Sequence, residues 1–238
     1  MMFRCWGVFT LAFALSVGLL MSGCGTDHTQ YRVVLASNDS GNIDAAVDGK
    51  TVVTNLAFGE ASPGSGYLTV ATGHHTIEIR PTGTTTDLVN SSVSAGQGRA
   101  YTFIVSGFVT PPSEGDPGIA VIVLTDDHSA AAGNSVKLRV AHVAPDLSTS
   151  LNVYIVPTGT DITGLSPTIP SLTYGQASLY RTPAAGSVEV IVTETTDQVP
   201  IIDQTFDLSA GQNRTVLLLD NGAGGGNLPS FVTLADLN

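Results

Sequence analysis

The chain has 238 residues, of which 42% are hydrophobic, 6% aromatic and 12% charged. This apolar content is too high for a disordered chain, and the lack of helical heptads argues against long helices and coiled coils. The net charge of -11 and the presence of only two lysines, Lys50 and Lys137, argue against nucleic-acid binding. Thr, Ser, Val and Gly dominate, which is typical of short strands joined by tight turns.

Residues 1–23 have the features of a secretory signal peptide. Arg4 is a lone positive charge, residues 5–20 are almost entirely apolar, and the small residues Ser22 and Gly23 directly precede Cys24. This arrangement resembles a bacterial lipoprotein signal, with Met21 where leucine is usual. The alternative is an uncleaved membrane anchor, for which the apolar run is slightly short because a span needs ~20 apolar residues.

Lipidation of Cys24 by acyl chains such as palmitate predicts an exported protein held on a bacterial membrane. Gly25, and not Asp, follows the cysteine, and in this the chain resembles Gram-negative lipoproteins that are exported to the outer membrane. The outer membrane or cell surface is therefore the expected location. The only other cysteine, Cys5, is removed with the signal, so disulfides and thiol catalysis are not expected. Residues 24–30 form a short tether, which predicts a first domain close to the bilayer that projects the second domain outward.

One sequence unit occurs twice along the chain. Residues 55–62 (NLAFGEAS) match residues 171–178 (SLTYGQAS), and residues 94–99 (SAGQGR) match residues 209–214 (SAGQNR). Single positions agree in the same order: Arg32 with Arg139, Val33 with Val140, and Asp39 with Asp146. We therefore predict a first domain at residues 31–128, a linker at 129–135 and a second domain at 136–238.

Alternating hydrophobicity predicts strands throughout both units. Three sets of residues each share a face: Ile77 with Ile79; Tyr101 with Phe103 and Val105; and Val188 with Val190 and Val192. Asp48-Gly49 is a hairpin signal, because that turn needs two positive φ angles. About seven or eight short strands per unit suit a two-sheet sandwich, so an all-β fold is predicted.

The second unit carries a motif that resembles the opening of the DUF4397 domain: Arg139-Val-Ala-His142-Val-Ala-Pro145-Asp146, then Leu151-Asn-Val-Tyr154. The first unit supplies features that resemble the rest of that domain: Val47-Asp48-Gly49-Lys50, Leu56-Ala-Phe58-Gly59, and Thr76-Ile-Glu-Ile-Arg80-Pro81. The resemblance implies two tandem immunoglobulin-like β-sandwich domains on an exported protein. The family's function is unknown, so no catalytic residue or cofactor is carried over. The first unit departs from the motif, with Leu35-Ala-Ser37-Asn38 where the His and Pro stand.

Several polar residues are candidates for a functional site. His74 and His75 are expected at a turn edge, because neighbours on a strand point to opposite faces and cannot easily chelate one ion. His142 is expected to bond the backbone of the following turn, with a catalytic base as the alternative. The run from Asp39 to Asp44 is expected to be an ordinary loop, with a Ca²⁺ site left open.

The ends of the two units carry acidic residues. The run Asp126-Asp127-His128, and its counterpart Asp236, are expected to be solvated strand ends. No catalytic, metal or cofactor site is predicted, since no nucleophile elbow or phosphate-binding loop is present.

The two loops before the last strand of each unit, at residues 111–118 and 222–229, are rich in Gly and Pro and unlike each other. Sandwiches bind through such loops, so a protein or glycan partner is expected there. The predicted function is that of a non-catalytic binding, adhesion or scaffold module. An envelope-polymer hydrolase or metal-dependent enzyme using carboxylates or His142, and a passive spacer, remain alternatives.

Overall fold

A computed structural model describes residues 28–147, 149–220 and 229–237. The predicted signal peptide and Cys24 lie outside these residues, as does the loop at 222–229 apart from Pro229. All regular structure in the described part is β, and none of its segments is a helix long and apolar enough to cross a membrane. The all-β prediction is confirmed.

The described residues form nine strands in the N-terminal half and seven in the C-terminal half. The first half exceeds the expected number because two short strands, β4 and β5, pair separately with β1. The N-terminal strands are β1 (His28–Leu35), β2 (Ile43–Val47), β3 (Lys50–Leu56), β4 (Ala61–Ser62), β5 (Leu68–Ala71), β6 (Gly73–Pro81), β7 (Val89–Ala95), β8 (Ala100–Ser106) and β9 (Ala120–Asp126). The C-terminal strands are β10 (Lys137–His142), β11 (Leu151–Pro157), β12 (Ile169–Leu172), β13 (Gly186–Glu194), β14 (Pro200–Leu208), β15 (Asn213–Leu219) and β16 (Ser230–Leu237).

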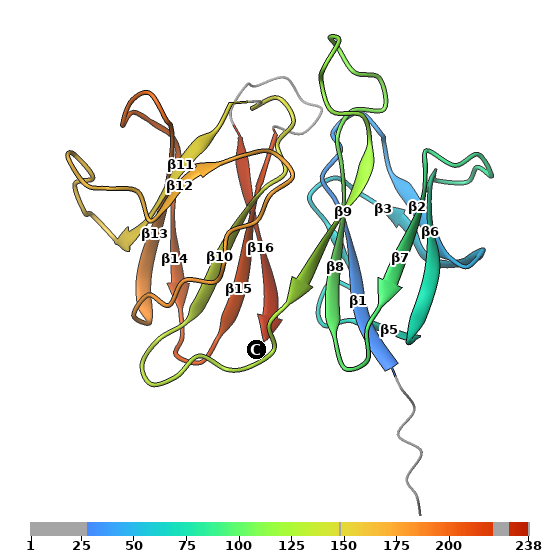
Figure 1. The fold of residues 1–238 in the computed structure, drawn as a ribbon, viewed down its shortest axis with the longest axis horizontal. Helices are drawn as coiled ribbons and strands as arrows, with labels where there is room; N and C mark the ends of the chain where they lie inside the picture. The colour runs from blue at the N-terminus through green and yellow to red at the C-terminus, as the bar shows by residue number, and fades with distance from the viewer. Residues whose placement is uncertain (1–27, 148, 221–228, 238) are drawn as a thin grey trace, which may run out of the picture.

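These strands form four sheets, two in each half (Figure 1). The first half has the orders β3-β2-β6-β7 and β4-β1-β8-β9, and the second half has β10-β15-β16 and β12-β11-β13-β14. Each half contains one parallel pair, β1 with β8 and β10 with β15, among antiparallel neighbours. Two sheets per half confirm the predicted sandwich architecture.

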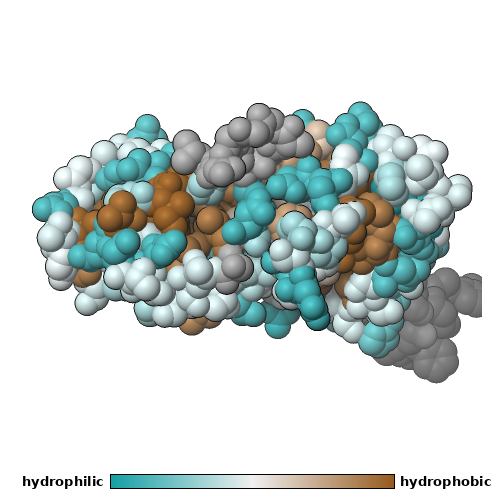
Figure 2. Space-filling model, turned by 90° about the horizontal axis from the view of Figure 1, so that it is seen from above, coloured by the Kyte–Doolittle hydropathy of each residue, from teal (hydrophilic) through white to brown (hydrophobic). Residues whose placement is uncertain are grey.

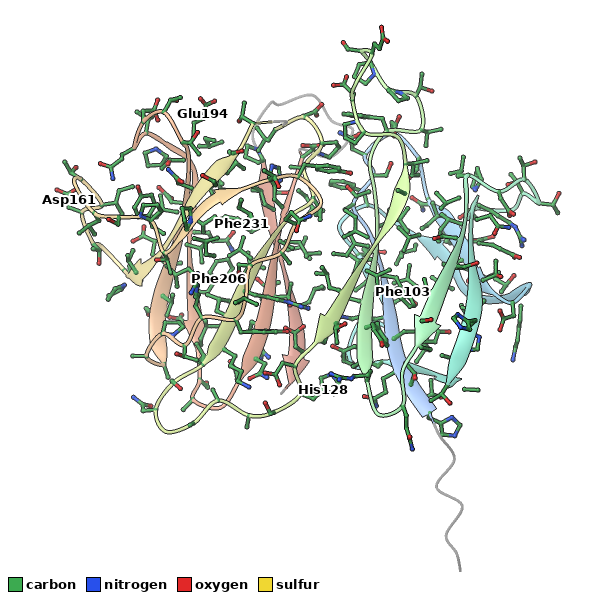
Figure 3. The ribbon with its side chains drawn as sticks, in the orientation of Figure 1. Phe103, His128, Asp161, Glu194, Phe206 and Phe231 are labelled. Atoms are coloured by element: carbon green, nitrogen blue, oxygen red, sulfur yellow. The ribbon has the colours of Figure 1, made fainter. Side chains whose placement is uncertain are left out.

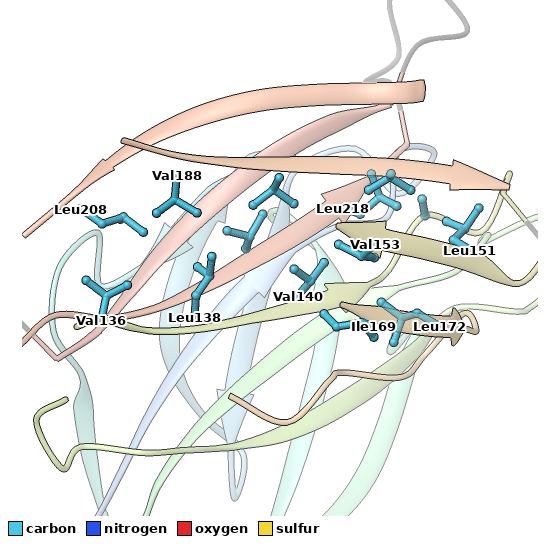
Figure 4. Close-up of a cluster of buried hydrophobic side chains, with 14 residues drawn as sticks. Val136, Leu138, Val140, Leu151, Val153, Ile169, Leu172, Val188, Leu208 and Leu218 are labelled. Carbon is cyan, nitrogen blue, oxygen red and sulfur yellow. The ribbon is translucent and has the colours of Figure 1, made fainter. Parts of the chain in front are cut away.

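Each sandwich encloses its own apolar core. In the first half, Val33, Ile77, Ile79, Phe103 and Val105 pack together, which confirms the predicted inward faces. In the second half, the equivalent core includes the predicted trio of Val188, Val190 and Val192 (Figure 4). Burial of these side chains is the main favourable contribution to folding.

A third apolar cluster joins the two halves. It contains Val34 and Ile104 from the first half and Ala141, Leu217 and Leu219 from the second. The β4-β1-β8-β9 sheet therefore buries both faces, one inside its own sandwich and one against the β10-β15-β16 sheet. The two sandwiches lie side by side with their strands upright in Figure 1. The expectation that the first domain projects the second outward is wrong, because the halves share a core along their length.

Two details of the chain bear on the positions of the boundaries and turns. The Asp48-Gly49 hairpin has φ angles of 51° and 76°, as that turn type requires. Strand β1 begins at His28, three residues before the expected start of the first domain. The tether between Cys24 and the first strand is correspondingly shorter.

Candidate functional site

The most extensive polar constellation in the described residues lies between the two halves. Arg32, on β1, is buried and reaches across the junction. Its Nε donates to Thr102 Oγ1 (2.8 Å) in its own half, and its Nη1 donates to the Ala235 carbonyl (2.7 Å) in the other half. Its Nη2 forms an ion pair with Asp236, near the end of β16. One guanidinium thus satisfies partners in both sandwiches.

Arg139, on β10, makes the same contacts in the opposite direction. Its Nε donates to Thr215 Oγ1 (2.7 Å), its Nη1 donates to the Thr125 carbonyl (2.8 Å), and its Nη2 pairs with Asp126. The two halves therefore exchange arginines across a pseudo-twofold junction. Each arginine comes from the strand that opens one half, and each aspartate from the strand that closes the other.

A tyrosine completes each side of this exchange. Tyr67 donates its hydroxyl to Asp126 Oδ2 (2.7 Å), and its ring lies 4.8 Å from the Arg32 guanidinium. Burial and the negative charge of Asp126 raise the pKa of Tyr67, so the phenol stays a donor. The same arrangement is repeated by Tyr180, Asp236 and Arg139. We call these six side chains, together with Thr102 and Thr215, the junction network.

The junction network corrects the expectation of solvated strand ends. Asp126 and Asp236 are only 7% and 2% exposed, because each strand end is covered by the opposite half. A buried carboxylate is tolerated when it is paired and hydrogen-bonded, which both of these are. The sequence signal that was missed is a charged residue within each opening apolar strand, at Arg32 and Arg139.

A cavity of about 370 Å³ opens beside the junction network, at the end of the molecule where β1 begins. Its lining includes Arg99, Asp127, His128 and Tyr180. Figure 3 places His128 between the halves at that end. Asp127 is already held by Lys137 Nζ (2.5 Å), and His128 packs on Tyr67 with ring centroids 5.0 Å apart. The lining thus combines both charges and presents no convergent set of metal ligands.

His142 is fully buried, and its ring forms hydrogen bonds with the backbone of the turn that follows it, as predicted. Its Nε2 donates to the Leu147 carbonyl (2.8 Å), and its Nδ1 accepts the Ala144 N–H (3.4 Å). Burial lowers the pKa of His142, which favours the neutral ring. Both ring nitrogens are engaged and the ring is not exposed, so the geometry favours the turn role over the alternative of His142 as a catalytic base.

His74 and His75, at the start of β6, have separate partners. His74 Nδ1 bonds Ser94 Oγ (3.0 Å), whereas His75 bonds Asp48 Oδ2 (2.6 Å) and the Ala71 carbonyl (2.8 Å). The bond from Asp48 raises the pKa of His75. The neighbouring rings do not converge, as expected for adjacent residues on a strand.

The two carboxylates of the Asp39–Asp44 run accept hydrogen bonds from different segments of the backbone. Asp39 accepts the N–H groups of Val109 (2.9 Å) and Thr110 (3.0 Å). Asp44 accepts the N–H groups of Asn55 (2.8 Å) and Gly83 (3.1 Å). The loop interpretation accounts for both carboxylates without a cation.

The β8–β9 loop, residues 107–119, projects beyond the sheets at the end opposite to the start of β1 (Figure 1). Residues 109–115 are all exposed, while Phe108 at the base is buried and bridged to Gly118. Gly107 has a φ of 96°, and a Cβ there would overlap the Gly118 carbonyl. Seen from above in Figure 2, hydrophilic residues cover much of the centre of this end. The predicted binding loop is therefore an exposed tip on a fixed base.

Asp220 lies at the end of β15, where the β15–β16 loop begins, and is 2% exposed. Its carboxylate accepts the Asp146 N–H (3.1 Å). Burial raises the pKa of Asp220 to about 7. Gly107 stands at the corresponding place in the first half, so this buried acid belongs to the second half alone. Nothing in the sequence pattern marked it.

Comparison with protein families gives one match: the family model described as "Domain of unknown function (DUF4397)" matches residues 29–154, more than half of the chain. No curated protein matches the chain.

Among solved structures, the likenesses include carbohydrate-binding modules. One is CBMbc, of family CBM26, from Eubacterium rectale Amy13K in complex with maltoheptaose, at 8% identity and a TM-score of 0.28, covering 85% of this chain and 95% of that one. Two others are from streptococcal virulence factors, one described by α-glucan binding and one by α-glucan recognition through family 41 modules. They are 9% and 12% identical, each with a TM-score of 0.26, and each covers 79% of this chain and 92% of the other. TM-scores this low do not establish a common fold, so these likenesses assign no ligand here.

Proposed function

The chain belongs to the DUF4397 family, and from that premise we propose that it is a non-catalytic binding module of the bacterial cell envelope. In this proposal a lipid on Cys24 anchors two tandem sandwich domains, at residues 31–128 and 136–238. The loops at residues 111–118 and 222–229 contact a protein or glycan partner. The outer membrane or cell surface is the proposed location.

The observation that carries this proposal is the position of the β8–β9 loop relative to the start of the chain's first strand. Cys24 lies four positions before His28, a distance of at most about 14 Å when extended. Strand β1 begins at one end of the sandwich, and the exposed β8–β9 loop stands at the other (Figure 1). A lipid at Cys24 thus leaves the loop end free to meet a partner.

The junction network and the shared apolar cluster support the same proposal. The apolar cluster joins the two sandwiches along their length and the junction network joins them toward the end where β1 begins, so the loop ends of both halves face the same direction. Loops on a rigid sandwich are a common means of recognition. The base of the β8–β9 loop is fixed by Asp39 and by the bridge at Phe108, which reduces the ordering that binding would require.

The test is photo-crosslinking in intact cells, followed by mass spectrometry. Photoreactive residues are placed at Ser113 and at Asn227, one in each loop. A matched probe at Ser209, in the exposed turn at the opposite end, serves as the control. We expect one recurrent partner from Ser113 or Asn227 and none from Ser209. No adduct above background from either loop would favour the passive spacer instead.

Lipid anchoring is tested separately by Cys24→Ala. We expect this variant to move from the membrane fraction to the soluble fraction, because several acyl chains on Cys24 would anchor almost permanently at ~0.8 kcal/mol per buried CH₂. The measurement is fractionation with immunodetection, with Cys5→Ala as the control that keeps the acceptor cysteine. Continued partitioning of the Cys24→Ala variant with membranes would show that lipid on this residue is not the anchor.

A further inference from the structure

Acidic side chains are concentrated at the loop end of the molecule. The connections that follow β1, β3, β6, β8, β10, β13 and β15, which run toward this end and turn back there, contain no lysine or arginine. Strand β12 also runs toward this end, but residues 173–185 after it return to the opposite end before β13 begins, and they carry Arg181 there. The connections that turn back at the loop end contain eight acids: Asp39, Glu60, Asp87, Glu114, Asp116, Asp146, Asp197 and Asp220. Of these, Asp87 is paired with Arg80, near the end of β6, and Asp220 is buried, which leaves six acids without such compensation. This end therefore repels an anionic surface.

The opposite end carries the exposed cations. Arg99 is in the β7–β8 turn, Lys50 begins β3, and Arg181 bridges to Leu138 near the start of β10. Within the described ranges, no carboxylate lies at ion-pair distance from Arg99, Arg181 or Lys50.

The acids at this end are offset by these cations and by Lys137. Asp127 pairs with Lys137 and Asp48 bonds His75, whereas Asp207 accepts only from the neutral Ser187 Oγ (2.5 Å) and Asp161, in the connection after β11, accepts from the Thr163 N–H (2.9 Å). Positive and negative charges are therefore nearly balanced at this end, whereas acids predominate at the loop end.

The cationic turn lies directly beside the start of β1. Gly98 N–H donates to the His28 carbonyl (3.3 Å), and Gln30 N–H donates to the Arg99 carbonyl (2.9 Å). Arg99 is thus held next to the residue that is only four positions from Cys24. Electrostatic interactions with a membrane surface act over a Debye length of about 8 Å, and the short tether allows this end to come within that distance of the bilayer.

We propose that the end bearing Arg99, Arg181 and Lys50 is a membrane-facing surface, and that anionic phospholipid headgroups hold the chain upright with the β8–β9 loop directed away from the bilayer. This inference rests on the lipid anchor at Cys24 proposed above. An anchored chain that tilts brings the acids of the loop end toward the anionic surface and moves the cations away from it. The charge asymmetry therefore opposes tilting, whereas the lipid alone fixes only one point.

The test measures orientation on vesicles. The lipidated protein is reconstituted on phosphatidylcholine vesicles with and without phosphatidylglycerol. Ser209→Cys or Ser113→Cys is labelled with a fluorophore, and energy transfer to a headgroup-labelled lipid is recorded. Because Cys24 is blocked by lipid in this proposal, the label attaches only to the introduced cysteine.

On anionic vesicles we expect several-fold greater transfer from position 209 than from position 113, and a smaller difference on neutral vesicles. Arg99→Glu combined with Arg181→Glu should remove the effect of the anionic lipid. The control, Arg80→Glu, changes a cation that is already paired with Glu78 and Asp87 toward the loop end, and should retain that effect.

Equal transfer from the two positions on anionic vesicles would overturn the orientation, as would a double variant that behaves like the parent. If the parent protein does not float with vesicles of either composition, the lipid anchor itself fails and this inference fails with it. Flotation without an orientation difference overturns the membrane-facing surface alone.

Discussion

Asp236→Ala is expected to lower the free energy of unfolding by about 3–5 kcal/mol, because it removes the carboxylate closest to the buried Arg32 guanidinium and leaves that charge poorly compensated. Arg32 is 3% exposed, and its remaining carboxylate neighbour, Asp126, is 3.5 Å away. Thr215 and Tyr180 also lose their shared acceptor. Asp126→Ala should lower the free energy of unfolding by a similar amount, since it removes the carboxylate that pairs with the buried Arg139.

Urea unfolding followed by circular dichroism measures this effect. Asp207→Ala is the matched control, because it removes an exposed carboxylate bonded to one serine and should change stability by less than about 0.5 kcal/mol. If Asp236→Ala and Asp207→Ala unfold at the same urea concentration, the junction network does not stabilise the chain as described.

Asp220→Asn is expected to remove a pH-dependent loss of stability. Burial raises the pKa of Asp220 to about 7, whereas an unfolded aspartate has a pKa of about 3.9. Between these values the folded state retains a proton that the unfolded state has lost, so the free energy of unfolding falls as pH rises from about 4 to about 7. The loss is complete above pH ~7 and amounts to about 2–4 kcal/mol, at 1.36 kcal/mol per pKa unit.

Asparagine preserves the oxygen that accepts the Asp146 N–H but carries no charge, so the variant should be more stable than the parent at pH ~8 and similar at pH ~4. The groups that face Asp220 are Asp146, whose charge raises its pKa further, and Tyr174. His142 has the opposite effect on the pH dependence of stability. Because its pKa is lowered in the folded state, the free energy of unfolding of the parent falls as the pH falls below the pKa of an unfolded histidine. The difference between the free energies of unfolding of the variant and the parent at each pH isolates the contribution of Asp220, because His142 is present in both.

Urea unfolding at four pH values between these limits gives the free energy of unfolding as a function of pH. For the control Asp207→Asn, which changes an exposed carboxylate, this free energy should differ from that of the parent by the same small amount at every pH. A constant offset between Asp220→Asn and the parent across the range would show that Asp220 is already ionised in the folded protein at low pH.

The alternation of apolar residues was sufficient to predict the strands and their inward faces. Ile77 and Ile79, and the set formed by Val188, Val190 and Val192, lie in the cores as expected, because a strand places alternate side chains on one face. The Asp48-Gly49 turn was equally predictable, since few residues adopt two successive positive φ angles. The turn role of His142 followed from its place before Val143 and Pro145.

The candidate site was only partly predictable. The loop at residues 111–118 was identified from its composition and is exposed as expected, but its fixed base was not. That base depends on Asp39, whose chain position is distant from Val109 and Thr110. The junction network was missed altogether, although the repeat had aligned Arg32 with Arg139.

By itself, the sequence determined the all-β class, the repeated unit and the inward face of the strands, because these follow from interactions between residues close in the chain. Only the tertiary structure decided that the halves lie side by side and that Asp126 and Asp236 are buried. Burial of the second face of a strand depends on what packs against it, and here that partner lies in the other half of the chain. A carboxylate that closes a strand has the same local sequence whether water or an arginine from the other half of the chain becomes its partner.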